Sequence, residues 1–219
     1  MRRRAWLALV ASLALGACGT FGDGDPPAAS DAGTSDAAAV DGGPPVDAAP
    51  AVDGAVDASS GKLVGFVTSS SYENVATPYD ADAKCRAEAD GRLPGKFVAW
   101  FSAFDPPTPA PARLVTSKNV AVDGPWYRVD GKRVVADRAA LSEAAKTPLE
   151  NPIDQTATGA PKTGSAWTAT RADGGAGQIC SDADPTKGLV TATDARWTEE
   201  GDFTAGCSSS LSLYCFQVE

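Results

Sequence analysis

The stretch that decides the fold reads LPGKFVAWFS and covers residues 93–102. Its second half, Phe97 to Ser102, is a short apolar run with one β-branched and three aromatic residues. Runs of this length and composition are typical of buried strands. Pro94-Gly95 precedes the run and indicates a turn. We therefore expect a loop that leads into a buried strand at Phe97–Ser102.

A helix is predicted immediately before this loop. Thr77-Pro78 has the pattern of a helix start, with proline in the first turn, and the helix should run to about residue 90 and stop at Gly91. Three of its residues, Ala81, Cys85 and Ala89, share one face at spacings of four. Cys85 is therefore expected to point toward the core.

The other predicted elements are short. They are strands at Lys62–Thr68, Ala166–Thr170 and Leu211–Val218, a hairpin of Trp126–Val129 and Lys132–Val135 around Asp130-Gly131, a second helix from Asp137 to Lys146 capped by Asp137, and loops over Pro106–Pro111 and Arg171–Gly206. Short strands around two helices predict an α+β domain.

Composition excludes several classes of function. The chain has no histidine, so neither a Ser-His-Asp triad nor an imidazole metal site can be built. Its net charge is −9, and no basic stripe with interleaved aromatics occurs. Since nucleic-acid affinity comes mainly from phosphate neutralisation, we expect no nucleic-acid partner. We also expect no catalytic residues, no cofactor and no metal ligands.

The N-terminus is typical of an exported protein. Arg2-Arg3-Arg4 precedes an apolar core from Ala5 to Leu15, which is too short to span a bilayer. Leu15-Gly16-Ala17-Cys18 closes that core and resembles the lipobox of bacterial lipoproteins. The resemblance implies a signal peptide of residues 1–17 and acyl chains, palmitate among them, on Cys18, which would anchor the chain in a membrane. The alternative is a plain secreted protein with a chance cysteine.

Residues 18–60 are expected to form a disordered tether. From Gly19 to Ser60 the sequence has eight Asp, no Lys or Arg, and Phe21 as its one aromatic. Such a segment cannot bury enough apolar surface to offset the entropy of ordering, and its like charges extend it. The composition changes at Gly61, which should begin a head domain over residues 61–219.

The head contains four cysteines, at positions 85, 180, 207 and 215. An even number in an exported chain predicts disulfides, and spacing alone leaves all three connectivities open. A pair of reactive thiols is the alternative.

The head resembles endostatin, the C-terminal domain of a basement-membrane collagen. The residues that carry the resemblance are ADAKC at 81–85, LPGKFVAWFS at 93–102, VDGK at 129–132, SAW at 165–167 before Cys180, and LYCF at 213–216. Their order and spacing agree over nearly all of Gly61 to Glu219. The head is more similar still to endostatin-like domains of bacterial lipoproteins whose function is unassigned.

The resemblance implies a C-type-lectin-like fold with mixed, mainly antiparallel sheets, two helices and a long irregular loop region. It also implies nested disulfides, Cys85 with Cys215 and Cys180 with Cys207. It does not bring endostatin's zinc site, which needs histidines, or its arginine-rich heparin surface. The calcium–sugar triplets of true C-type lectins are not matched either, because Glu150-Asn151-Pro152 has the wrong order.

Two groups of residues are candidates for a ligand site. Trp126 and Trp197 lie near predicted loops and could stack on sugar rings, with core packing as the alternative. Acidic residues gather in the loop region 171–206 and could hold a hard cation, with a solvated loop as the alternative: Asp173, Asp182, Asp184, Asp194, Glu199, Glu200 and Asp202.

These observations predict a non-enzymatic, lipid-anchored protein of the bacterial cell envelope. Its head should face the periplasm or the cell surface and bind a protein or glycan ligand. Gly19 follows the lipid cysteine where Asp often signals inner-membrane retention, so the family analogy favours the outer membrane. The alternatives are a structural envelope lipoprotein without a soluble ligand and an enzyme that uses carboxylates.

Overall fold

The computed structural model describes residues 62–180, 185–201 and 206–219, all within one compact unit, Ala51–Glu219. The expected signal peptide (1–17), the lipid cysteine Cys18, the tether (18–60) and Gly61 lie outside these residues. Among the described residues, no helix combines the length and apolar character needed to cross a membrane.

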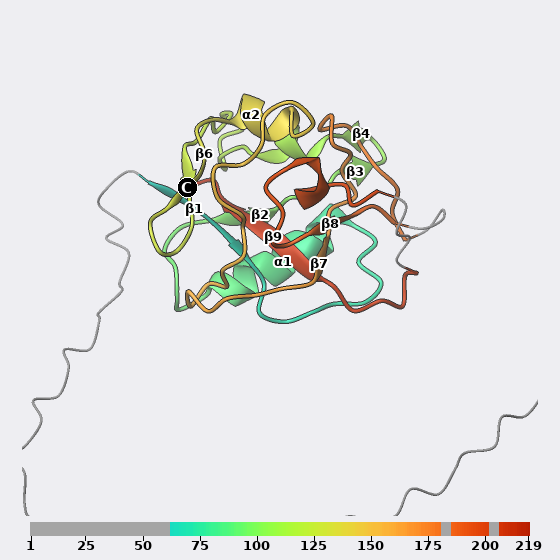
Figure 1. Cartoon of the computed structure of the whole chain (residues 1–219), viewed down its shortest axis with the longest axis horizontal. Helices are drawn as coiled ribbons and strands as arrows, with labels where there is room; N and C mark the ends of the chain where they lie inside the picture. Colours follow the sequence, from blue (N-terminus) through green and yellow to red (C-terminus); the bar gives the residue numbers. More distant parts are fainter. Residues whose placement is uncertain (1–61, 181–184, 202–205) are drawn as a thin grey trace, which may run out of the picture. The chain divides into compact units, whose positions relative to one another are not determined.

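A mixed seven-stranded sheet is the centre of the described part (Figure 1). Six strands follow the order β6-β5-β1-β9-β7-β8, and β2 also pairs with β9. Their bounds are β1 Leu63–Val67, β2 Phe97–Ala99, β5 Trp126–Tyr127, β6 Arg133–Val135, β7 Ser165–Trp167, β8 Lys187–Leu189 and β9 Ser212–Gln217. The helices are α1 Pro78–Ala89 and α2 Arg138–Ser142, and a separate two-stranded hairpin joins β3 Ala103–Phe104 to β4 Pro107–Thr108.

Strand β9 organises the sheet. It pairs antiparallel with β1 on one side, while β2 (antiparallel) and β7 (parallel) follow one another along the other side. Successive side chains of a strand point to opposite faces. Accordingly, Tyr214 and Phe216 belong to one hydrophobic cluster, and Leu213 and Cys215 belong to the second. Both faces of β9 are therefore covered.

The two helices cover opposite faces of the sheet. Helix α1 contributes Ala81, Cys85 and Ala89 to the cluster around Cys215. Helix α2 contributes Leu141 to the other cluster, which also holds the large rings of Trp100 and Trp126. The result is an α+β architecture with a core on each side of the sheet.

Several predicted elements are confirmed. Helix α1 starts after the cap Thr77, whose side chain accepts a hydrogen bond from the Asp80 backbone, and it ends before Gly91. The hairpin of β5 and β6 turns at Asp130-Gly131, where Gly131 has a φ of +81° that favours glycine. The strands at both ends of the head, β1 and β9, are also where the alternation of side chains predicted them.

Other elements are shorter than predicted. The pairing of β2 with β9 ends at Ala99. Beyond it, the backbone N–H of Trp100 donates to Tyr214 O, and the backbone N–H of Ser102 donates to Thr168 O. The whole predicted run, Phe97–Ser102, is nevertheless buried. Helix α2 keeps its predicted cap, Asp137, but ends at Ser142, and the segment up to Lys146 forms turns.

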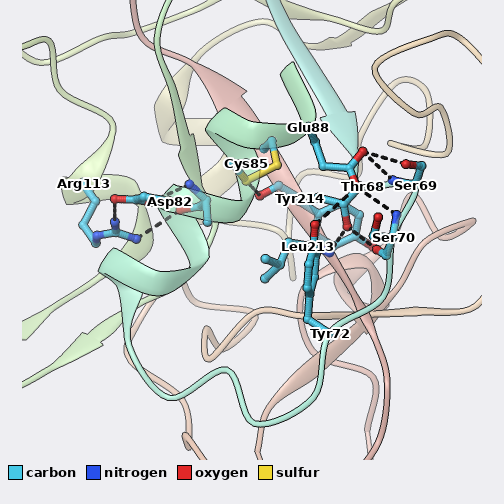
Figure 2. Close-up of a disulfide and its surroundings, with 12 residues drawn as sticks. Thr68, Ser69, Ser70, Tyr72, Asp82, Cys85, Glu88, Arg113, Leu213 and Tyr214 are labelled. Atoms are coloured by element: carbon cyan, nitrogen blue, oxygen red, sulfur yellow. Dashed lines mark hydrogen bonds and ion pairs between the residues drawn. A yellow bond between two sulfur atoms is a disulfide. The ribbon is translucent and has the colours of Figure 1, made fainter. Parts of the chain in front are cut away.

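Three side chains, one turn apart, attach α1 to the rest of the head (Figure 2). In chain order they are Asp82, Cys85 and Glu88. Asp82 pairs with Arg113, Cys85 is bonded to Cys215, and Glu88 accepts hydrogen bonds from the segment after β1. The first and last are carboxylates on the inward face of a helix, where burial requires that they be paired.

Glu88 is held as a carboxylate by four donors. Its oxygens accept from Ser69 Oγ at 2.6 Å, Ser69 N at 3.3 Å, Ser70 N at 2.9 Å and Tyr72 Oη at 3.3 Å. Burial by itself would raise the pKa of Glu88, but the hydrogen bonds from Ser69 and Ser70 outweigh burial and lower the pKa to about 2. Burial and the Glu88 charge together raise the pKa of the Tyr72 hydroxyl.

Replacing Glu88 by glutamine should therefore destabilise the head in a pH-dependent way. At pH 7 the expected loss in free energy of unfolding is about 1–3 kcal/mol, the range for a buried charged hydrogen-bonding group. Because the folded pKa is depressed, this stabilisation is complete above the unfolded pKa of about 4.3 and is lost as the pH falls toward 2.

The measurement is urea unfolding of wild type and Glu88→Gln at pH 7, 4 and 2. The difference should shrink with falling pH and be small at pH 2, where about half of Glu88 is already protonated in the folded state. Glu143→Gln is the matched control, because Glu143 is exposed and pairs with Lys146 at 3.7 Å. A difference that stays constant with pH would contradict the assigned role.

Candidate functional site

The tryptophans predicted as sugar-stacking residues are both in the core, so that prediction is wrong. Trp126 is fully buried, packs edge-on against Phe216 and donates from Nε1 to Gln217 O at 2.9 Å. Trp197 is 1% exposed and packs against Trp100 and Tyr214. Loops of the head fold over the sheet, and residues in or near those loops supply much of its core.

The acidic residues of the loop region do not form a metal site among the residues that the structure describes. Asp194 pairs with Arg196 at 2.9 Å, and Glu200 with Lys187 at 3.4 Å. No group of three or more potential ligands occurs in the described ranges. Asp182, Asp184 and Asp202 lie outside them.

One of the two expected disulfides is present in the structure. Cys85 and Cys215 form a buried disulfide, with their Cα atoms 5.5 Å apart. The expected bridge between Cys180 and Cys207 is not formed, because the structure has both as thiols. The Cys207 thiol is instead directed at the carbonyl oxygen of Cys180, 2.9 Å away.

Burial, followed by the hydrogen bond and charge of Cys207, raises the pKa of the Cys180 thiol to about 12.

The most distinctive surface feature is a groove of about 500 Å³ between the start of α1 and the β3–β4 hairpin. Two aromatic rings border it, Tyr79 at 82% exposed and Phe104 at 51%. Tyr79 is in the first turn of α1 and Phe104 is in β3. Its other lining residues are Ala76, Thr77, Pro78, Ala103, Asp105, Pro106, Thr108, Arg113 and Ile179.

Local sequence explains both aromatic walls. Tyr79 precedes the inward-facing Ala81 by two residues, or about 200° around the helix, so its ring points away from the core. Phe104 begins the turn of the hairpin and is opposite Pro107 in the register of β3 with β4. Proline cannot donate a backbone hydrogen bond, so this hairpin stays short and peripheral.

Arg113 fixes one end of the groove. Its guanidinium pairs with Asp82 at 2.6 Å and donates to Ala99 O at 3.1 Å and to Phe101 O at 2.5 Å. The Arg113 and Asp82 side chains are 12% and 11% exposed. Asp82 is on α1 and Ala99 is in β2, so the contacts of Arg113 join the helix to the strand beside the groove.

A second hollow, of about 610 Å³, lies between α2 and the loops around it. Its charged residues include Asp123, Arg138, Glu143 and Asp173, and Arg138 pairs with Asp123 at 3.3 Å. None of its lining residues is aromatic. The first groove offers more exposed apolar surface to a ligand and is the stronger candidate site.

Sequence reasoning missed this groove. Tyr79 follows Thr77-Pro78, a pattern that predicts only a helix start, and Phe104 lies close to Pro106–Pro111, whose prolines predict only a loop. The available signal was an aromatic outside the inward face of a predicted helix, together with a second aromatic beside prolines. Sequence alone could not show that the two are neighbours.

A comparison of the sequence with protein-family models and with curated proteins gives no match. The function therefore has to be inferred from the residues and the geometry described above.

Proposed function

We propose that this chain is a lipid-anchored, non-enzymatic protein of the bacterial cell envelope that uses no cofactor. Its endostatin-like head binds an envelope or extracellular ligand in the groove between Tyr79 and Phe104. The observation that carries the binding role is the exposure of both rings on one preformed groove. Exposed aromatics grouped around a concavity are typical of ligand and partner sites.

The proposal of a C-type-lectin-like, endostatin-like fold is supported by how the ends of the head meet. The first and last strands pair antiparallel, with Phe66 opposite Cys215. The first helix is bonded to that last strand by the outer of the two expected bridges. A mixed sheet with two helices is consistent with the same fold.

The proposed anchor rests on residues 1–18 and has its own test. Cys18→Ala should abolish acylation and either release the chain from membranes or leave it unprocessed, because the acyl chains supply the membrane affinity. Cells are labelled with an alkyne fatty acid, and the chain is then captured and its label quantified. Equal labelling of variant and wild type would refute the lipoprotein assignment. Cys180→Ala serves as the matched cysteine control and should keep full labelling.

The binding role is tested with the full chain, purified in detergent, on a glycan array and on immobilised envelope fractions. The double variant Tyr79→Ala, Phe104→Ala should reduce specific binding at least tenfold, because it removes both walls of the groove. Val120→Ala is the matched control, since Val120 is 60% exposed and does not line the groove. Binding that survives the double variant would exclude this groove as the site.

A further inference from the structure

We propose that the groove binds an extended polypeptide segment in which a lysine or arginine neighbours proline or aliphatic residues. This inference rests on the proposed binding function and names the ligand class for the same site. Three features of the groove carry it: apolar walls, one unpaired negative charge, and few free polar side chains.

The walls suit flat apolar groups. Between Tyr79 and Phe104 the surface consists largely of Ala76, Pro78, Ala103, Pro106 and Ile179. Aromatic-lined grooves accept the rings of proline-containing segments, which are already extended and so lose little entropy on binding. Aliphatic side chains fit the same surface by hydrophobic contact.

The charge of the groove is unbalanced. The lining contains two charged residues, Asp105 and Arg113. Arg113 is neutralised by Asp82 at 2.6 Å, whereas Asp105 is exposed and has no ion pair among the described residues. The groove therefore carries one free carboxylate beside its apolar walls. A cationic side chain complements that carboxylate, and an acidic one is repelled.

The polar side chains of the groove favour a peptide over a sugar. Thr77 Oγ1 accepts from the Asp80 backbone, and Thr108 Oγ1 donates to Pro106 O. With Arg113 also engaged, Asp105 and the Tyr79 hydroxyl remain as polar side-chain groups without a partner in the described ranges. A glycan presents many hydroxyls, and each one left unpaired on desolvation costs binding energy.

The chain's own N-terminal segment is a poor occupant. Residues 19–60 contain prolines, but their eight aspartates and lack of Lys or Arg oppose the charge of Asp105. The fitting partner is therefore a segment of another polypeptide.

The test is selection of a random twelve-residue phage-displayed peptide library on the full chain in detergent, followed by titration of the selected synthetic peptides by fluorescence anisotropy. Selected sequences should contain Lys or Arg next to proline or aliphatic residues. Phe104→Ala and Tyr79→Ala should each weaken binding at least tenfold. Asp105→Asn should weaken it several-fold and flatten its dependence on salt, and Asp105→Lys should abolish it. Val120→Ala should leave it unchanged.

The outcomes separate this inference from the function on which it rests. Acidic or uncharged selected peptides, or affinities that ignore Asp105→Lys, would overturn the ligand class. Glycan binding that Phe104→Ala removes, with no peptide selected, would overturn the peptide assignment and keep the binding function. If wild type and the Tyr79→Ala, Phe104→Ala double variant give the same result with both peptides and glycans, both proposals fail. Thermal melts that match wild type show that the exposed-site variants are folded.

Discussion

Replacing Cys85 and Cys215 together by alanine is expected to lower the free energy of unfolding of the head by up to about 5 kcal/mol. The bond joins residues 130 apart in sequence, so it restricts most of the unfolded head. Both residues are fully buried, and each alanine also removes a sulfur from the core cluster between α1 and β9. Chemical denaturation under non-reducing conditions measures the loss.

The matched control is the pair Cys180→Ala, Cys207→Ala. Both residues are partly buried thiols, so their replacement should cost much less than loss of the disulfide. Non-reducing peptide mapping of wild type tests the connectivity directly. A peptide that links Cys207 to Cys215, or Cys85 to Cys180, would contradict it. A Cys180–Cys207 peptide would show that the second bridge forms on oxidation, and the control variant would then lose about 3.5 kcal/mol.

Asp82→Ala should have an effect of similar size, about 3–5 kcal/mol, because it leaves the Arg113 guanidinium buried without its counterion. The variant also removes the acceptor for the Ala99 backbone N–H, which Asp82 Oδ1 binds at 2.8 Å. Asp82→Asn keeps an oxygen for Ala99 and should recover part of the loss. Urea unfolding at pH 7 measures all of these differences.

Asp80→Ala is the control for this prediction. Asp80 is on the same helix and pairs with Lys84 at 2.5 Å, but its side chain is 44% exposed. Surface pairs at this spacing contribute only about 0.3–0.5 kcal/mol. Equal losses for Asp82→Ala and Asp80→Ala would mean that the buried pair has no special role in holding α1.

Much of the backbone could be predicted from local signals. The start of α1 at Thr77-Pro78, its inward cysteine and the Asp130-Gly131 turn follow from capping, periodicity and turn chemistry. These signals are local because each depends on residues a few positions apart. The resemblance to endostatin added what local signals cannot give, the pairing of Cys85 with Cys215.

The features that sequence reasoning missed depend on distant neighbours. Asp82 and Glu88 are carboxylates, a residue type that is rarely buried, and their burial depends on partners elsewhere in the chain. Arg113 is 31 residues from Asp82, and Ser69 is 19 from Glu88. Tyr79 is the opposite case, an aromatic residue that stays exposed because no other element packs over its ring. Periodicity predicts the direction of a side chain from its helix or strand. It does not predict which distant residues that side chain contacts.

The disulfide also has a mechanical consequence. Strand β1 begins on the side of the head where the C-terminus lies, and the β3–β4 hairpin that borders the groove is on the opposite side (Figure 1). A partner that pulls on Tyr79 while the chain is held from residue 62 would load α1, because Tyr79 is in the first turn of that helix. That load passes through the covalent bond from Cys85 to Cys215 and reaches β1 at Phe66, directly opposite Cys215. Tension between the two attachment points would then be borne along the β1–β9 ladder, while the helix stays fastened to the sheet.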